Sequence, residues 1–127
     1  SFSNDLKNWR RYDNNPIIDI GGWNSYNALF SSDLKVFRYG DIWIGFFFGV
    51  NRSGAHIMIA FSRDVLHWTV NPEPLYFAGG HPNGLDSEYA HKISIIRNPM
   101  NDILYMFYCA TGKQGRNICL LTSQSLN

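Results

Sequence analysis

Four ionisable side chains lie close together in residues 85–92, although only 17% of the chain is charged. Two are the carboxyl groups of Asp86 and Glu88, and two are the bases His91 and Lys92. A carboxyl group can donate or accept a proton in catalysis, and imidazole and ammonium groups can bind hydroxyl or carboxylate groups of a ligand. The alternative is a solvated loop in which Lys92 pairs with a neighbouring carboxylate.

A strand through this segment would separate the four groups. Successive side chains of a strand point to opposite faces, so Tyr89 and His91 would share one face while Ala90 and Lys92 share the other. The four groups can therefore reach one pocket only if the residues before the strand form a loop.

A second set of candidates lies upstream, at the predicted start of another strand. The carboxylate of Asp33 could act on a ligand or cap a turn. The indole of Trp23 could stack on a ligand or pack in a buried interface. Asn24 does not ionise, so its side chain can only form hydrogen bonds. Arg97 stands 59 residues after Arg38, and this spacing aligns Lys92 with Asp33.

The cysteines and histidines do not form a metal-ligand pattern. Cys109 and Cys119 are equidistant from residue 114, so a hairpin centred there would place them opposite each other. A disulfide is then allowed, but we expect two buried free thiols. The four histidines lack the spacing of a zinc site, and we expect no cofactor.

Composition excludes several classes of protein. The 127 residues carry a net charge of +1, which provides no basic excess for nucleic acid or anionic membranes. The longest apolar run, residues 42–50, is far shorter than the ~20 residues of a membrane span. The 16% aromatic content excludes a disordered chain. A small globular domain, or a part of a larger one, remains.

The sequence contains internal repeats. The segment SNDLKNW from Ser3 recurs 59 residues later as SRDVLHW from Ser62, and a third, truncated copy begins at Ser123 with Ser125 and Leu126. Residues 41–49 also match residues 102–110, and 56–62 match 117–123, both at a spacing of 61. In the repeated motif, we expect Asp5 and Asp64 to hold a turn and Trp9 and Trp68 to pack between units.

Each repeat unit has the pattern of a small antiparallel sheet. The apolar and aromatic runs, separated by turn residues, predict strands over residues 35–39, 42–49, 56–62, 92–97, 103–110 and 116–122, with a fourth strand of the first unit near residue 68. Middle strands that are apolar on both faces indicate stacked sheets. The predicted fold is all-β, consisting of two blades of a β-propeller with antiparallel four-stranded sheets.

The repeat unit resembles the blade of five-bladed propeller glycoside hydrolases of the family 43, 32 and 117 type. The resemblance is carried by DLKVFRYGDIWIGFFFG, HIMIAFSRDVLHW and PLY in the first unit, and by EYAHKISII and DILYMFYCATGKQGRNICLLTS in the second. It covers nearly the whole chain. It implies a glycosidase that acts on plant or microbial oligo- or polysaccharides through paired carboxylates.

The resemblance also implies roles for the candidate residues. Asp33 matches the Asp of the family's Asp-Pro position, as a general base or as a modulator of the acid, although Leu34 replaces the Pro. Glu88 or Asp86 is the candidate proton donor. The candidate sugar-binding residues are Trp23, Asn24, His91, Lys92 and Arg97; many relatives have Asp at the Asn24 position. The family class also allows a Ca²⁺ ion in the channel, but this sequence does not require one.

Two blades make an incomplete propeller. We expect residues 1–31 to end a preceding blade, residues 32–78 to form a blade and residues 79–127 to form a truncated one. The chain is then a portion of a longer protein, or its copies associate, and alone it does not catalyse. Two rival hypotheses are a non-catalytic carbohydrate-binding propeller and an interaction fragment that pairs through open blades. The sequence gives no signal that assigns a cellular location.

Overall fold

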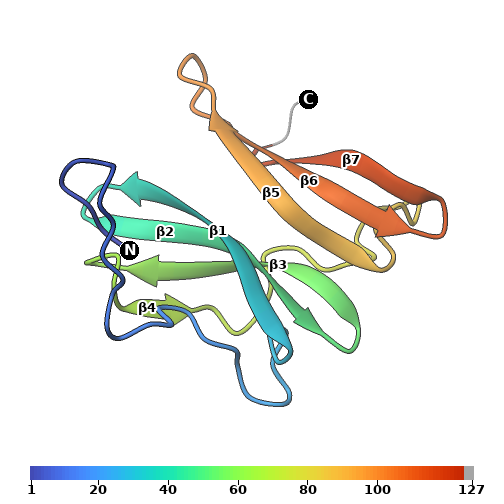
Figure 1. The fold of residues 1–127 in the computed structure, drawn as a ribbon. Coiled ribbons are helices and arrows are strands. Elements are labelled where there is room, and N and C mark those ends of the chain that lie inside the picture. The colour runs from blue at the N-terminus through green and yellow to red at the C-terminus, as the bar shows by residue number, and fades with distance from the viewer. Residues whose placement is uncertain (125–127) are drawn as a thin grey trace.

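The computed structural model describes residues 1–124, which form an all-β structure without helices (Figure 1). The strands are β1 (Phe30–Tyr39), β2 (Ile42–Asn51), β3 (Gly54–Ser62), β4 (Trp68–Val70), β5 (Tyr89–Arg97), β6 (Leu104–Gly112) and β7 (Gly115–Thr122). Within residues 1–124, no helix is available to cross a membrane.

The strands form two antiparallel blades, as the sequence predicts. Blade I consists of β1 to β4 in chain order, and blade II consists of β5, β6 and β7. Figure 1 shows the two blades side by side, with β5 next to blade I. They are joined by one parallel pair, Ala55 of β3 with Tyr89 of β5.

Short turns make each blade a meander. Tyr39 pairs with Ile42, so Gly40 and Asp41 form a two-residue hairpin turn, and Gly40 adopts the positive φ of 59° that such turns require. The β6–β7 turn is equally short, because Gly112 pairs with Gly115.

The repeated Ser-x-Asp motif forms the same turn twice, which confirms its predicted role. The Ser62 Oγ accepts hydrogen bonds from the backbone N–H groups of Asp64 and Val65, and the Trp68 Nε1–H donates to the Val65 carbonyl. Residues 3–9 repeat this pattern 59 residues earlier. Of the third copy, Ser123 is described, whereas Ser125 and Leu126 lie outside the described residues.

The tryptophans of these turns do not pack between the two blades. Trp68 packs on the cluster of Phe47, Met58 and Ala60 within blade I. A Cβ on Gly45 would lie 2.8 Å from the Trp68 ring, so this glycine provides room for the indole. Trp9 is largely exposed. Among the described residues the contacts of Trp68 are therefore within its own blade, and an inter-blade role for it stays a prediction.

The main core lies between the blades. Phe46 and Ile57 of blade I pack with Ala90, Ile93, Met106, Tyr108, Ala110 and Cys119 of blade II. Because β2, β3 and β6 carry apolar side chains on both faces, each blade can bury a face against a neighbouring layer.

The predicted pairing of the two cysteines is wrong by one residue. Cys109 pairs with Ile118, whereas Cys119 pairs with Tyr108, because the β6–β7 turn contains two residues, 113 and 114. Directly opposite residues share a face and successive residues alternate, so the two thiols point to opposite faces. Both are free.

Candidate functional site

Two β-bulges stand at equivalent positions of the inner strands β1 and β5, which are the first strands of the two blades. Asp33 in β1 and Lys92 in β5 have positive φ values of 61° and 51°, and the pairing register shifts at each of them. These equivalent bulges confirm the predicted alignment of Lys92 with Asp33, 59 residues earlier. Positive φ is strained for residues other than glycine, and such bulges re-aim side chains next to functional sites.

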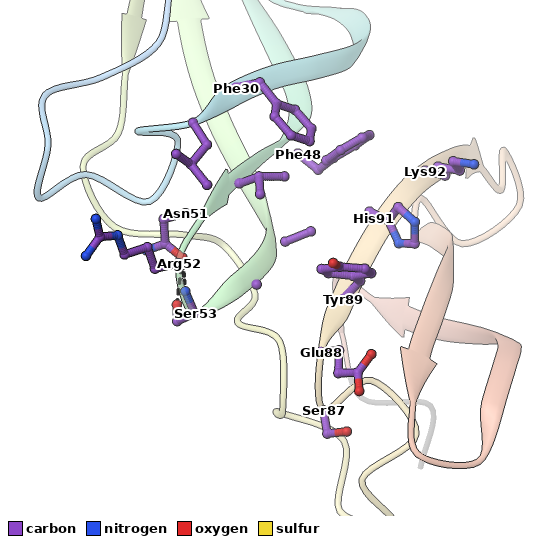
Figure 2. A pocket seen from close by; sticks show the side chains of 14 residues that line it. Phe30, Phe48, Asn51, Arg52, Ser53, Ser87, Glu88, Tyr89, His91 and Lys92 are labelled. Carbon is purple, nitrogen blue, oxygen red and sulfur yellow. Dashed lines mark hydrogen bonds between the residues drawn. The ribbon is translucent and has the colours of Figure 1, made fainter.

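A cleft of about 750 Å³ lies between the blades, at the start of the inner strands. Figure 2 shows Phe30 and Phe48 on the blade I wall and Tyr89 and His91 on the blade II wall. Three of the predicted site residues line this cleft: Glu88, His91 and Lys92. The cleft therefore combines an aromatic interior with a carboxylate, an imidazole and an ammonium group from blade II.

His91 presents an unprotonated ring nitrogen. Its Nδ1 lies 3.0 Å from the Cys109 carbonyl oxygen, which can only accept a hydrogen bond, so Nδ1 carries the proton and Nε2 is left as an acceptor. The ring packs against Phe48 and Tyr89, with centroid distances of 5.4 and 5.5 Å. Burial lowers the pKa of His91, although the hydrogen bond with the Cys109 carbonyl acts in the opposite direction. The side chain is thus a neutral acceptor at pH 7.

Glu88 has its backbone tied to both blades. Its N–H donates to the Thr111 carbonyl at 3.0 Å, and its carbonyl accepts from the Ala55 N–H at 3.3 Å. Glu88 lines the cleft, and within residues 1–124 no hydrogen bond or ion pair engages its exposed side chain. The carboxylate is therefore available to a ligand.

Asp86 lies outside the cleft and is fully buried. Its carboxylate accepts hydrogen bonds from the Tyr108 hydroxyl at 2.8 Å and the His81 backbone N–H at 3.1 Å. Asn27, 59 residues earlier, is also buried, and its amide bonds to Ser31. Because an amide occupies the equivalent position in blade I, the placement of Asp86 fits a structural role better than proton donation.

Asp33 does not line the main cleft. It forms an ion pair with Lys35 and lines a separate hollow of about 380 Å³ together with residues 15–18 and Phe47. The structure therefore does not bring Asp33 and Glu88 into one cavity.

Trp23 and Asn24 line a smaller hollow of about 200 Å³. This hollow shares Leu29, Asn51 and Arg52 with the main cleft, so the two lie next to each other. Trp23 is 72% exposed, and the Arg52 guanidinium lies 4.5 Å from the centre of its ring. This exposure argues against a buried packing role for Trp23 within the described residues.

Arg97 lies at the opposite end of β5 from the cleft-lining residues. Its guanidinium forms an ion pair with Asp102 in the β5–β6 connection. The structure therefore does not bring Arg97 together with His91 and Lys92.

Ser53 and His56 form a second polar group beside the cleft, which the sequence analysis did not single out. His56 Nε2 lies 3.0 Å from the Ser53 Oγ. The Ala78 N–H donates to Nδ1, so the proton of the neutral ring is on Nε2, and His56 cannot accept a proton from Ser53 there. The pair holds the β2–β3 turn against Ala78 in the linker, residues 71–88 between β4 and β5. It is not a catalytic nucleophile paired with a base.

The aromatic lining was also missed, although a sequence signal for it exists. Phe30 and Tyr89 are 59 residues apart and begin the two inner strands. Among the described residues, no group of three or more His, Cys, Asp or Glu side chains could hold a metal ion.

Solved structures of glycoside hydrolases share this fold. A BT0996 RGII complex aligns with a TM-score of 0.80 and 27% identity, over 98% of this chain and 35% of that protein. A structure described as a glycoside hydrolase aligns with a TM-score of 0.79 and 27% identity, over the same shares of the two proteins. A thermostable family-43 glycoside hydrolase aligns with a TM-score of 0.57 and 19% identity, over 87% of this chain and 32% of that protein.

These similarities show the fold but do not single out family 43, 32 or 117. No protein-family model matches the chain, and no curated protein matches it. The chain spans 35% of the length of the first two structures. It therefore has the fold of two blades of the β-propeller found in glycoside hydrolases.

Proposed function

We propose that the chain supplies two blades of a glycoside hydrolase that cleaves glycosidic bonds in plant or microbial oligo- or polysaccharides. The observation that carries the proposal is the cleft at the start of the inner strands, where Glu88, His91 and Lys92 meet an aromatic wall. Likeness to a glycoside hydrolase over 98% of the chain supports it. The activity is proposed for the complete propeller, with the blades divided at residues 32–78 and 79–127.

In this proposal Glu88 is the proton donor. Glu88 lines the cleft and is exposed, whereas the carboxylate of Asp86 is buried against Tyr108. A protonated Glu88 would transfer its proton to the glycosidic oxygen as the bond to the anomeric carbon breaks, and water would supply the new oxygen. Asp33 would accept the proton that the attacking water releases, or would modulate the acid. Because Asp33 lines a separate hollow, this role requires the complete propeller to join that hollow to the cleft.

His91, Lys92, Trp23 and Asn24 would hold the sugar. The free Nε2 of His91 can accept a hydrogen bond from a sugar hydroxyl, and Lys92 can donate to a hydroxyl or carboxylate. The exposed face of Trp23 suits the apolar face of a sugar ring. The neighbour described as a complex with RGII supports a carbohydrate as the ligand. A role for Arg97 in this binding stays a prediction.

The test is substitution in the complete propeller. Glu88→Gln and Asp33→Asn should each lower kcat/KM by ~10²–10⁴ on a panel of arabinosides, xylosides and galactosides, because each removes an acid–base group. Glu73→Gln is the matched control, since Glu73 is exposed and does not line the cleft. Losses below about tenfold for both site variants would contradict the proposal.

A non-catalytic carbohydrate-binding propeller is the second candidate. It is favoured by Lys92, which places a cation where blade I has the carboxylate of Asp33, and by the separation of Asp33 from Glu88. For this candidate, calorimetry would detect sugar binding by the complete protein, which the Glu88→Gln variant retains, while the unaltered protein hydrolyses none of the panel.

A further inference from the structure

The guanidinium of Arg52 lies over the exposed indole ring of Trp23, at 4.5 Å from the ring centre. The two side chains come from separate parts of the chain, the β2–β3 turn and the segment before β1. The face of an indole attracts a cation, but it offers no acceptor to the N–H groups in the plane of the guanidinium. The contact therefore holds the Arg52 side chain in place and leaves its N–H donors available to a ligand.

The charge of Arg52 has no counter-ion among the described residues. The ion pairs within residues 1–124 involve other side chains. The hollow of about 200 Å³ that Arg52 lines with Trp23 contains no Asp or Glu. The carboxylate of the adjacent cleft belongs to Glu88 on the blade II wall, and Figure 2 shows the Arg52 guanidinium turned away from that wall. The hollow therefore carries a positive charge that is free to meet an anionic ligand.

Lys92 adds a second cation to the lining of the cleft. In blade I the equivalent residue, Asp33, pairs with Lys35, so the two charges cancel. In blade II Ser94 stands 59 residues after Lys35, and within residues 1–124 Lys92 forms no ion pair. When Glu88 is protonated, as proton donation requires, the cleft and the hollow together have two cations and no carboxylate anion in their lining.

A neutral sugar would leave these charges without a partner. A bound ligand displaces water from the charged groups around it, and a desolvated charge is costly unless an opposite charge replaces the water. A sugar carboxylate provides that charge, and the planar fork of an Arg side chain can bind both oxygens of a carboxylate. Asn24, which lines the same hollow, can donate an amide N–H to the same ligand.

We propose that the site binds an acidic saccharide, with the carboxylate of a uronic acid residue on Arg52 in the hollow and the neighbouring sugar in the cleft. The inference rests on the proposed function in that the ligand is a carbohydrate, and it adds the class of carbohydrate. Arg52 is then the residue that determines specificity, and Lys92 contributes positive charge from the opposite wall.

Binding to the complete protein tests the class of ligand. The probes are trigalacturonic acid and a xylotriose that carries glucuronic acid, each compared with its methyl ester, which keeps the sugar rings and removes the negative charge. Calorimetry on the Glu88→Gln variant measures affinity without hydrolysis. We expect a free acid to bind about tenfold more tightly than its ester. Equal affinities for acid and ester, or no binding of either acid, overturn the proposal.

Charge variants of the hollow test the role of Arg52. Arg52→Gln should weaken binding of the free acid about tenfold and leave that of the ester unchanged, whereas Arg52→Lys should keep part of the preference. Asn24→Asp should also lower the preference, because its carboxylate would supply a counter-ion within the hollow. Arg63→Gln is the matched control, since Arg63 is exposed in the β3–β4 connection and lines neither the cleft nor the hollow.

The outcomes separate this inference from the glycosidase function. A protein that prefers the free acid but hydrolyses no saccharide supports the inference and contradicts the glycosidase. A protein that hydrolyses the neutral panel but binds acid and ester equally overturns the inference alone. Equal losses of acid and ester affinity in Arg52→Gln also overturn it, because Arg52 would then support the shape of the site through a carboxylate of another blade.

Discussion

His56 is held in its neutral form by burial and by a backbone donor. Burial lowers the pKa of His56 from the ordinary value of 6.5. The Ala78 N–H also donates to its Nδ1 at 3.0 Å, a bond that a protonated ring cannot accept. Protonation therefore breaks the link between β3 and the linker that leads to blade II.

This arrangement predicts a pH-dependent stability. Because the pKa is lower in the folded state, the stabilisation by neutral His56 is present above 6.5 and is lost as the pH falls through the folded pKa. The free energy of unfolding, from urea titrations, should fall between pH 7 and pH 5, and His56→Gln should reduce that fall. Equal pH slopes for the two proteins would show that another group causes the dependence.

The aspartates of the Ser-x-Asp turns were predictable from sequence because their partners are local. The Asp64 carboxylate accepts from the N–H groups of Leu66 and His67, and its pKa is lowered, chiefly by the hydrogen bond with the His67 side chain. The backbone N–H of Asn8 is the largest cause of the lowered pKa of Asp5. The site was less predictable, since the burial of Asp86 depends on Tyr108, 22 residues away.

At the scale of elements, the inner strands begin earlier than the sequence pattern predicts. β1 starts at Phe30 and β5 at Tyr89, whereas the alternation of apolar residues indicates strands from residues 35 and 92. The bulges at Asp33 and Lys92 shift the register and interrupt the alternation, so the residues before them look like loop. The same bulges decide which side chains reach the cleft, and this explains why the site could not be assembled from alternation alone.

Gly54 sets how closely β3 approaches the start of β5. Its φ is +136°, and a Cβ there would lie 2.1 Å from the Glu88 carbonyl oxygen. That carbonyl accepts the hydrogen bond of the Ala55 N–H, so the two backbones cannot separate without losing a bond.

Gly54→Ala should therefore lower the free energy of unfolding by about 1–3 kcal/mol, through strain and displacement of the backbone. Gly22→Ala is the matched control, because a Cβ at Gly22 meets nothing within 4 Å, and should change stability by less than about 0.5 kcal/mol. Equal effects in denaturant titrations would mean that the close approach at Gly54 relaxes without cost.

At the scale of the whole molecule, stability depends on the core shared by the two blades. Ile57 and Ile118 occupy equivalent strand positions, but Ile57 is fully buried between the blades whereas Ile118 is exposed. Ile57→Ala should lower the free energy of unfolding by about 2–5 kcal/mol. Ile118→Ala should change it by less than about 0.5 kcal/mol when measured on dilute protein by denaturant titration. A similar loss for both would indicate that the blades do not share a core.

The one-residue register of the β6–β7 hairpin turns the two thiols into independent chemical reporters. Cys119 is buried in the core between the blades, so its alkylation requires that core to open. Cys109 points to the opposite face and is only partly buried, so a small thiol reagent reaches it without that opening. The alkylation rate of Cys119 therefore measures how often the core between the blades opens. The alkylation rate of Cys109 measures access to the face of blade II that is turned away from blade I.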